Sequence, residues 1–206
     1  MRNYSYLCSL IPGLAVLAGN LMGGWWVASN AVFSLVLLAG AERFLPENRS
    51  NQMTESDWLP DGLLITHLFL QILCISSMVW MVSVHQLNSI QLLLLALSVG
   101  CNSGSSAIVI AHELIHRKNR IMRNMGCLLL FSAGNIYFYV DHLKVHHKYV
   151  GTALDPASAR KGESLYAFFL RSTIGQVSSA FRVEFKRLQT PNRNGWFIRK
   201  IGRAHV

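Results

Sequence analysis

Charged residues are scarce in this sequence. Only 14% of its 206 residues are Asp, Glu, Lys or Arg, whereas 51% are hydrophobic. Soluble domains usually carry about 25% charged residues, so this composition excludes an ordinary soluble domain. The length is that of one domain, and we expect a single membrane-embedded domain over residues 1–206.

A cysteine pattern is also absent. The four cysteines, Cys8, Cys74, Cys101 and Cys127, lie in apolar stretches without C-x-x-C spacing. This argues against a zinc knuckle or a disulfide framework. We interpret the cysteines as small buried apolar residues.

Basic residues are nearly missing from the first half of the chain. Arg2, Arg43 and Arg49 precede Ile110, and the other 16 of the 19 Lys and Arg residues follow it. Beside hydrophobic helices, the common cause of such a gradient is the enrichment of Lys and Arg in cytoplasmic segments. We therefore expect a cytoplasmic second half in contact with membrane lipid, and no nucleic-acid partner.

Four hydrophobic stretches have the character of membrane spans. They cover residues 7–22, 25–40, 63–84 and 92–110. The first two are short and meet at Gly23 and Gly24, which predicts a tight helical hairpin. The sequence predicts an all-α fold of about four spanning helices followed by interfacial helices, the last a basic amphipathic helix over residues 164–189 on the inner leaflet.

Five of the eight histidines form two clusters. They are His112 and His116, and then His142, His146 and His147. Residues four apart share a helix face, so each cluster offers two imidazoles to one metal ion, and His147, turned about 100° away, can reach a neighbouring ion. Five imidazoles favour a dinuclear centre, for which iron is suited if the chemistry involves oxygen.

If the two histidine clusters share a site, residues 126–140 between them cannot cross the membrane. His112 lies twenty residues after Leu92, about 30 Å along a helix, and so emerges at the cytoplasmic surface. Residues 126–140 are apolar but short for a span. If they crossed the membrane, the clusters would lie about 30 Å apart, whereas two metals in one site lie about 4 Å apart. Either this segment turns back, or the two clusters do not share a site, and we expect it to turn back.

Two other interpretations remain open. His112-Glu113-Leu-Ile-His116 matches the H-E-x-x-H pattern of zinc proteases, in which the glutamate activates water. A membrane zinc metalloprotease predicts one zinc per chain, and a non-catalytic membrane protein predicts no stoichiometric metal. The second cluster supplies more nitrogen ligands than zinc hydrolysis requires, which disfavours the protease.

The residues resemble a known family. The histidine boxes are followed by Asp155-Pro-Ala-Ser-Ala-Arg160 and Gly162-Glu-Ser164. Together they resemble the integral-membrane alkane 1-monooxygenases of the fatty acid desaturase and hydroxylase superfamily. The second box departs from the usual family pattern at Asp141 and Val145, where Glu and Gly are common.

The resemblance implies a non-haem diiron enzyme of a bacterial inner membrane, with its metal site facing the cytoplasm. It implies hydroxylation of a terminal C–H bond of an alkane by O₂, with electrons from an NADH-dependent rubredoxin reductase and rubredoxin. The implied iron ligands are His112, His116, His142, His146 and His147. A fatty acid desaturase or hydroxylase of the same superfamily is the alternative.

The resemblance also implies further C-terminal helices and histidines. The codons that residues 201–206 imply resemble a sequencing adapter. We therefore expect a C-terminally truncated chain with an artificial tail over these residues and an incomplete iron site.

Several polar residues have two interpretations each. Glu113 and Asp141 either orient metal-bound imidazoles or form ion pairs at the surface. Ser98, Asn102 and Ser105 either pack helices together or line a hydrocarbon channel. Asp155 is expected to pair with Arg160 or to cap a loop, and His67 to make a hydrogen bond between helices.

Overall fold

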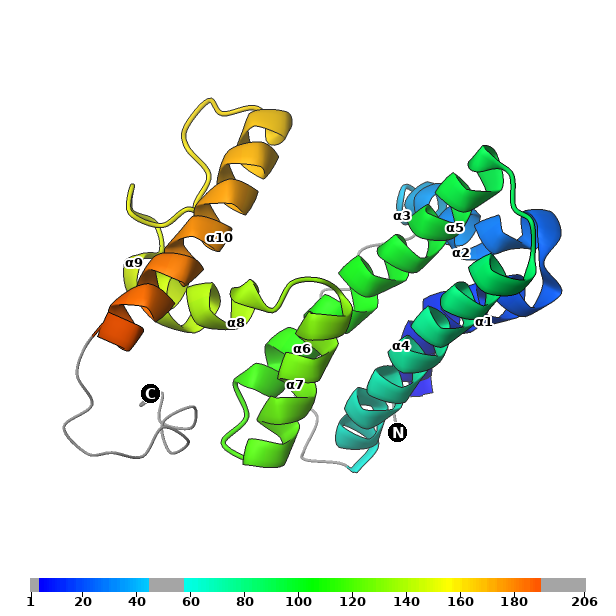
Figure 1. Cartoon of the computed structure of the whole chain (residues 1–206), viewed down its shortest axis with the longest axis horizontal. Helices are drawn as coiled ribbons and strands as arrows, with labels where there is room; N and C mark the ends of the chain where they lie inside the picture. The colour runs from blue at the N-terminus through cyan, green and yellow to red at the C-terminus, as the bar shows by residue number, and fades with distance from the viewer. Residues whose placement is uncertain (1–3, 45–57, 190–206) are drawn as a thin grey trace. The chain divides into compact units, whose positions relative to one another are not determined.

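The computed structural model describes residues 4–44 and 58–189 (Figure 1). In these two ranges every regular element is a helix, which confirms the predicted all-α fold. The chain divides into two compact units, Met1–Ala133 and Gly134–Val206. The expected artificial tail, 201–206, lies outside the described residues.

The first unit contains a series of helices, some joined without a break. They are η1 (Tyr4–Leu10), α1 (Ile11–Met22), η2 (Gly24–Ala28), α2 (Ser29–Val32), η3 (Phe33–Leu38), α3 (Ala39–Glu42), α4 (Trp58–Val84), α5 (Ser89–Asn102), η4 (Ser103–Ala107), α6 (Ile108–Ile115) and α7 (Arg120–Ser132). The η1 and η2 turns are 3₁₀, whereas η3 and η4 are π-helical turns inside longer helices.

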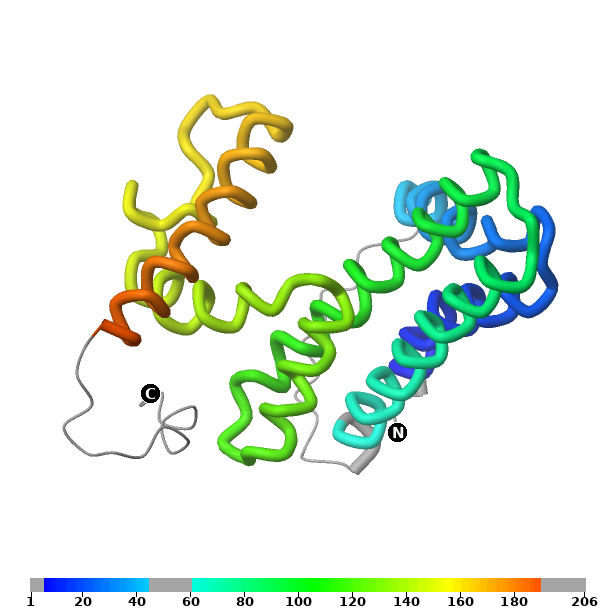
Figure 2. The backbone as a smooth tube through the Cα atoms, in the orientation of Figure 1, coloured from blue at the N-terminus to red at the C-terminus, as the bar shows by residue number. Residues whose placement is uncertain are grey.

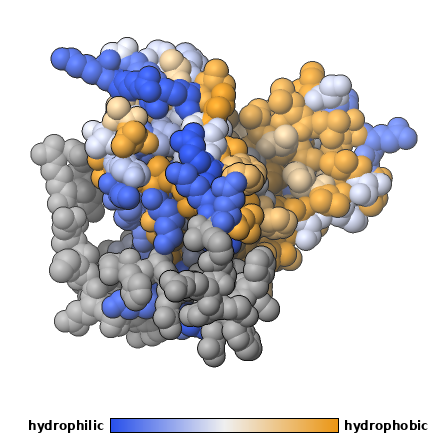
Figure 3. Space-filling model, turned by 60° about the vertical axis from the view of Figure 1, so that its left-hand side comes forward, coloured by the Kyte–Doolittle hydropathy of each residue, from blue (hydrophilic) through white to orange (hydrophobic). Residues whose placement is uncertain are grey.

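Three helices are long and apolar enough to cross a membrane. They are Gly24–Glu42, Asp61–Val84 and Ser89–Ile115. The first predicted span, residues 7–22, forms a shorter apolar helix, Tyr6–Met22, of about 25 Å at 1.5 Å per residue. Hydrophobic side chains gather over a wide outer face in Figure 3, as helices that contact lipid require. The chain is therefore an integral membrane protein.

A turn at two glycines joins the first two hydrophobic stretches. Gly23 and Gly24 have φ angles of 72° and 57°, a region that favours glycine. The Gly23 backbone N–H donates to the carbonyl of Gly19, and Ser29 Oγ donates to the carbonyl of Ala15, 14 residues earlier. The predicted helical hairpin is confirmed.

The longer helices pack with their polar side chains paired. Helices α4 and α5 are antiparallel and joined by a short turn (Figure 2). Asn88 and Gln91 form a capping box that begins α5. Asn20 Nδ2 donates to Ser77 Oγ at 2.9 Å, which ties α1 to α4 inside an apolar core. Interhelical hydrogen bonds of this kind stabilise membrane helices by about 0.6 kcal/mol each.

Helix α7 turns back beside α6 (Figure 1). A Cβ atom on Gly126 would lie 2.9 Å from Leu114 Cβ and 3.0 Å from the carbonyl oxygen of Ala111, so glycine allows the close approach. The helix ends at Ser132, and Gly134 takes a positive φ of 68°. Residues 126–140 therefore do not form one crossing helix, as predicted.

An ion pair fixes which ends of the spans lie together. Arg117, just after α6, donates to Asp61 at the start of α4 over 3.1 Å. The start of α4 and the end of α6 therefore lie at the same end of the first unit.

The second unit carries the second histidine cluster. Its helices are α8 (Tyr137–Asp141), the π-helical turn η5 (His142–His146), α9 (His147–Tyr149) and α10 (Leu165–Gln189). Helix α10 confirms the helix predicted over 164–189, while its place on the inner leaflet stays a prediction. Helix α8 packs against α10. Large hydrophobic side chains on α10, such as Phe169 and Phe181, remain exposed.

Candidate metal centre

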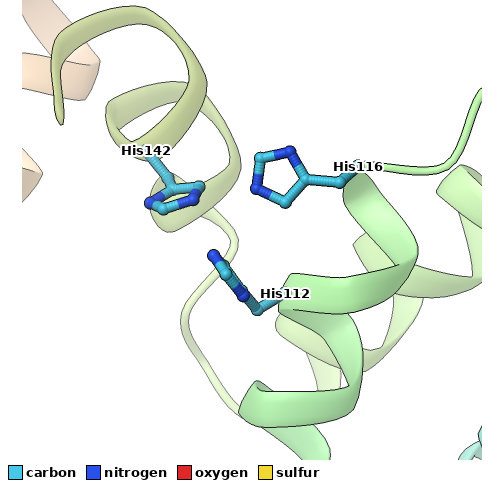
Figure 4. A group of neighbouring side chains, drawn as sticks. All are labelled: His112, His116 and His142. Carbon is cyan, nitrogen blue, oxygen red and sulfur yellow. The ribbon is translucent and has the colours of Figure 1, made fainter. Parts of the chain in front are cut away.

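The first histidine pair lies at the end of α6. His112 is in the last turn of the helix and His116 caps it. Figure 4 shows both rings projecting from this helix end. Their ring centroids are 4.9 Å apart and the rings are nearly perpendicular, at 81°. The spacing of four residues thus brings the two imidazoles together, as predicted.

The second cluster has a different geometry from the predicted one. Because His142–His146 is a π-helical turn, residues five apart face each other. His142 Nε2 and His147 Nε2 are 2.9 Å apart, whereas the His142 and His146 rings are stacked with centroids 5.3 Å apart. The sequence predicted that His142 and His146 share one face and that His147 is turned about 100° away from it, whereas the structure brings His147 beside His142.

This spacing fits a shared metal ion. Two nitrogen ligands that each lie about 2.1 Å from one ion, at a right angle, are about 3.0 Å apart. The Nε2 atoms of His142 and His147 are 2.9 Å apart, a distance that is close to this value and is also that of a hydrogen bond between the two rings. The donor set is all imidazole, the borderline ligand that suits iron, zinc and copper.

Asp155 holds the third imidazole of this cluster. Its Oδ2 atom lies 2.9 Å from His146 Nδ1. A carboxylate only accepts hydrogen bonds, so His146 carries its proton on Nδ1 and has a free lone pair on Nε2. Carboxylates commonly orient metal-bound histidines in this way. The sequence did not indicate this contact, since Asp155 lies nine residues after His146.

Hydrogen bonds keep Asp155 ionised. Burial by itself raises its pKa, but hydrogen bonds from Ser158 Oγ, the Ala157 backbone and His146 outweigh burial and hold the pKa below its ordinary value. The Ala157 bond, 3.0 Å long, caps the loop, so the predicted loop-capping role is confirmed. The structure gives Asp155 these partners in place of the expected Arg160.

The two predicted carboxylates beside the ligands have other contacts. Glu113 is exposed and pairs with Arg117 at 3.1 Å, the surface ion pair that was one of its two interpretations. Asp141 is buried and accepts a hydrogen bond from Ser179 Oγ. Burial raises the pKa of Asp141, although the Ser179 bond opposes this shift. An orienting role for either residue stays a prediction.

The predicted channel residues take part in helix contacts. Ser98 Oγ accepts from the backbone N–H of Asn30 at 3.1 Å, and Asn102 Nδ2 donates to Gln71 Oε1 at 2.9 Å. Ser105 is exposed and donates to Cys101 in its own helix. The contacts of Ser98 and Asn102 match the helix-packing interpretation, whereas the bond of Ser105 joins no second helix. A channel lined by these residues stays a prediction.

His67 is buried inside the first unit. Its Nε2 lies 3.0 Å from Ser9 Oγ and its Nδ1 lies 2.7 Å from Ser106 Oγ. Both ring nitrogens are therefore used between helices, which confirms the expected hydrogen-bonding role.

A bidentate ion pair closes the loop after the second cluster. Arg171 Nε and Nη2 donate to the two carboxylate oxygens of Glu163 at 2.6 and 2.7 Å. The hydrogen bond from Arg171 is the main cause that lowers the pKa of Glu163 to about 2, from an ordinary value of 4.5. The depressed pKa means that this pair contributes stability above about pH 4.5 and loses it as the pH falls toward 2.

This pair predicts a pH dependence. We expect Glu163→Gln to lower the melting temperature of the detergent-solubilised protein at pH 6 and to reduce the further loss between pH 4.5 and 3. Only the ionised carboxylate holds Arg171, so wild type and variant should converge as the pH falls. Melting followed by tryptophan fluorescence checks this. Melting curves that stay equally far apart at every pH would contradict it.

Comparisons with known proteins match the region of the histidine clusters. The fatty acid desaturase family model matches residues 88–205. Alkane 1-monooxygenase 1 of Alcanivorax borkumensis is 38% identical over 119 residues, which are 58% of this chain and 29% of that protein. Alkane 1-monooxygenase of Acinetobacter baylyi is 27% identical over 207 residues, 93% of this chain and 50% of that protein.

A relative with a different name also matches. The xylene/toluene monooxygenase hydroxylase component of Pseudomonas putida is 31% identical over 100 residues, 48% of this chain and 27% of that protein. The chain thus spans half or less of the length of these three relatives.

Proposed function

The chain belongs to the fatty acid desaturase family, and from this premise we propose that it is part of a membrane diiron monooxygenase that hydroxylates terminal C–H bonds of alkanes. The observation that carries the proposal is that imidazoles lie close together within each of two clusters, inside the residues that the family model matches. The names of the relatives support oxygenation of a hydrocarbon.

Each cluster would contribute ligands to a shared centre. His112 and His116 would come from the end of α6, and His142, His146 and His147 from η5 and α9. Two iron ions held there would supply the activation of O₂. The imidazole donor set and the 2.9 Å spacing of two Nε2 atoms support this assignment.

The chain's own residues would do the positioning. Asp155 sets the tautomer of His146, so that Nε2 is available without loss of a proton. The long apolar helices Asp61–Val84 and Ser89–Ile115 would exclude water from a hydrocarbon chain near the histidines. Electrons would come from NADH through a rubredoxin reductase and rubredoxin, on the cytoplasmic face of the inner membrane.

The metal content of the full-length gene product tests this proposal. We expect two irons per chain in protein purified from membranes, and oxidation of octane to 1-octanol that requires NADH, the reductase and rubredoxin. One zinc per chain with peptide cleavage would support the protease instead. No stoichiometric metal would contradict both enzymes.

The substrate can be tested in the same assay. The similarity to the xylene/toluene component makes a methyl-substituted aromatic the second substrate to compare. We expect octane to be oxidised with the higher kcat/KM. A higher kcat/KM for xylene would overturn the alkane assignment while keeping the oxygenase.

A further inference from the structure

One face of α10 contacts both sides of the second histidine cluster. Arg171, Gly175 and Ser179 are each four residues apart and therefore share one face of the helix. We call these three residues the α10 row. Each contacts a residue in the segment between Asp141 and Glu163, which contains His142, His146 and His147.

Arg171 holds the loop that follows the cluster. Besides its two bonds to Glu163, it donates from Nη1 to the carbonyl of Pro156 at 3.1 Å and from Nη2 to the carbonyl of Ser158 at 2.9 Å. These carbonyls belong to residues one and three positions after Asp155. The rigid fork of a guanidinium can make all these bonds at once, which the ammonium group of a lysine cannot.

Gly175 allows the helix to approach the same loop. A Cβ atom at this position would lie 2.6 Å from Pro156 Cβ, which is too close for any side chain without a shift. Pro156 directly follows Asp155, so the loop is held against α10 next to the carboxylate that binds His146.

Ser179 contacts the other side of the cluster. Its hydroxyl donates to the buried carboxylate of Asp141, which directly precedes His142. The row therefore contacts the chain immediately before the first histidine of the cluster and in the loop that follows the last. A helix with these contacts holds the residue before the π-helical turn and the loop that begins at Asp155.

We propose that the α10 row is the positioning face for the second histidine cluster, and that it presses Asp155 onto His146 so that the Nε2 atom of His146 is presented to the metal. The role of the row in metal binding rests on the proposed function. The contacts of Arg171, Gly175 and Ser179 are present without metal. The three residues are positioning residues and act through Asp155 and Asp141.

The tautomer of His146 tests the proposal in metal-free protein. The full-length protein is labelled with ¹⁵N in its histidine rings and studied in detergent micelles at pH 8, where imidazoles are ordinarily neutral. We expect the wild-type His146 ring to carry its proton on Nδ1. Arg171→Lys, Gly175→Ala and Ser179→Ala should each lower the Nδ1–H fraction, Arg171→Lys by about twofold or more.

Two matched substitutions on α10 serve as controls. Arg182→Lys changes an exposed arginine, and Ser178→Ala removes an exposed hydroxyl that bonds within the helix. Both should keep the wild-type tautomer. If Gly175→Ala does not fold, the two conservative variants decide. Wild-type tautomers in folded Arg171→Lys and Ser179→Ala would overturn the proposal.

Metal affinity separates this proposal from the proposed function. We expect Arg171→Lys to weaken binding of Co²⁺ to the metal-free full-length protein by about tenfold, as loss of outer-shell support commonly does. A wild-type protein that shows the Nδ1–H tautomer but binds no Co²⁺ or iron would refute the metal centre alone. Equal affinity of Arg171→Lys and Arg182→Lys would refute the positioning role alone.

Discussion

Replacing His146 by alanine is expected to lower the affinity of the full-length protein for iron by about 100-fold. It should also reduce hydrocarbon oxidation to background. Loss of an outer contact to a metal ligand costs about 10- to 100-fold in affinity, and loss of the ligand itself costs at least the upper end of that range. His112→Ala should have the same effect from the other cluster. Iron titration of metal-free protein and product formation measure both losses.

The comparison requires that the variants fold. His112 is exposed, so its loss removes little packing. His85→Ala is the matched control. His85 is an exposed histidine that directly follows α4 and contacts the ring of Trp80 in that helix. This variant should keep its iron and its activity. If His112→Ala bound iron as tightly as His85→Ala, the assignment of the first cluster to the metal centre would fail.

The sequence predicted the features that depend on local spacing. Lengths of hydrophobic stretches predicted the spans, because a helix needs about 20 apolar residues to cross a bilayer. The Gly23-Gly24 pair predicted the hairpin, since both residues take positive φ angles. The spacing of His112 and His116 predicted their contact, because α6 is a regular α-helix up to that point.

The sequence could not predict contacts that depend on tertiary structure. The π-helical turn at His142–His146 changes which histidines face each other, and no residue pattern predicted this turn. Asp155 reaches His146 because the loop is held by Arg171, which lies in a helix that begins ten residues after Asp155. Such a contact depends on how α10 packs against α8, which local patterns do not encode.

The close approach of α1 to the segment after Gly24 predicts that a substitution at Gly19 has a large effect on stability. Gly19 lies in α1, where a Cβ atom would overlap the backbone carbonyl oxygen of Trp26 and Ser29 Oγ in the returning arm of the hairpin. We expect Gly19→Ala to lower the free energy of unfolding by about 3 kcal/mol, the upper part of the usual range for overpacking, because backbone cannot move aside as a side chain can. Unfolding in mixed micelles with increasing SDS measures this loss.

Gly100→Ala is the matched control for this substitution. Gly100 lies in α5, within a span, and a Cβ atom there would meet nothing within 4 Å. Alanine is favoured over glycine inside a helix by up to about 1 kcal/mol, so this variant should be as stable as wild type or more stable. A destabilised Gly19→Ala beside an unaffected Gly100→Ala locates the effect in the hairpin. Equal stability of the two variants would mean that α1 and the segment after Gly24 do not pack as closely as the structure shows.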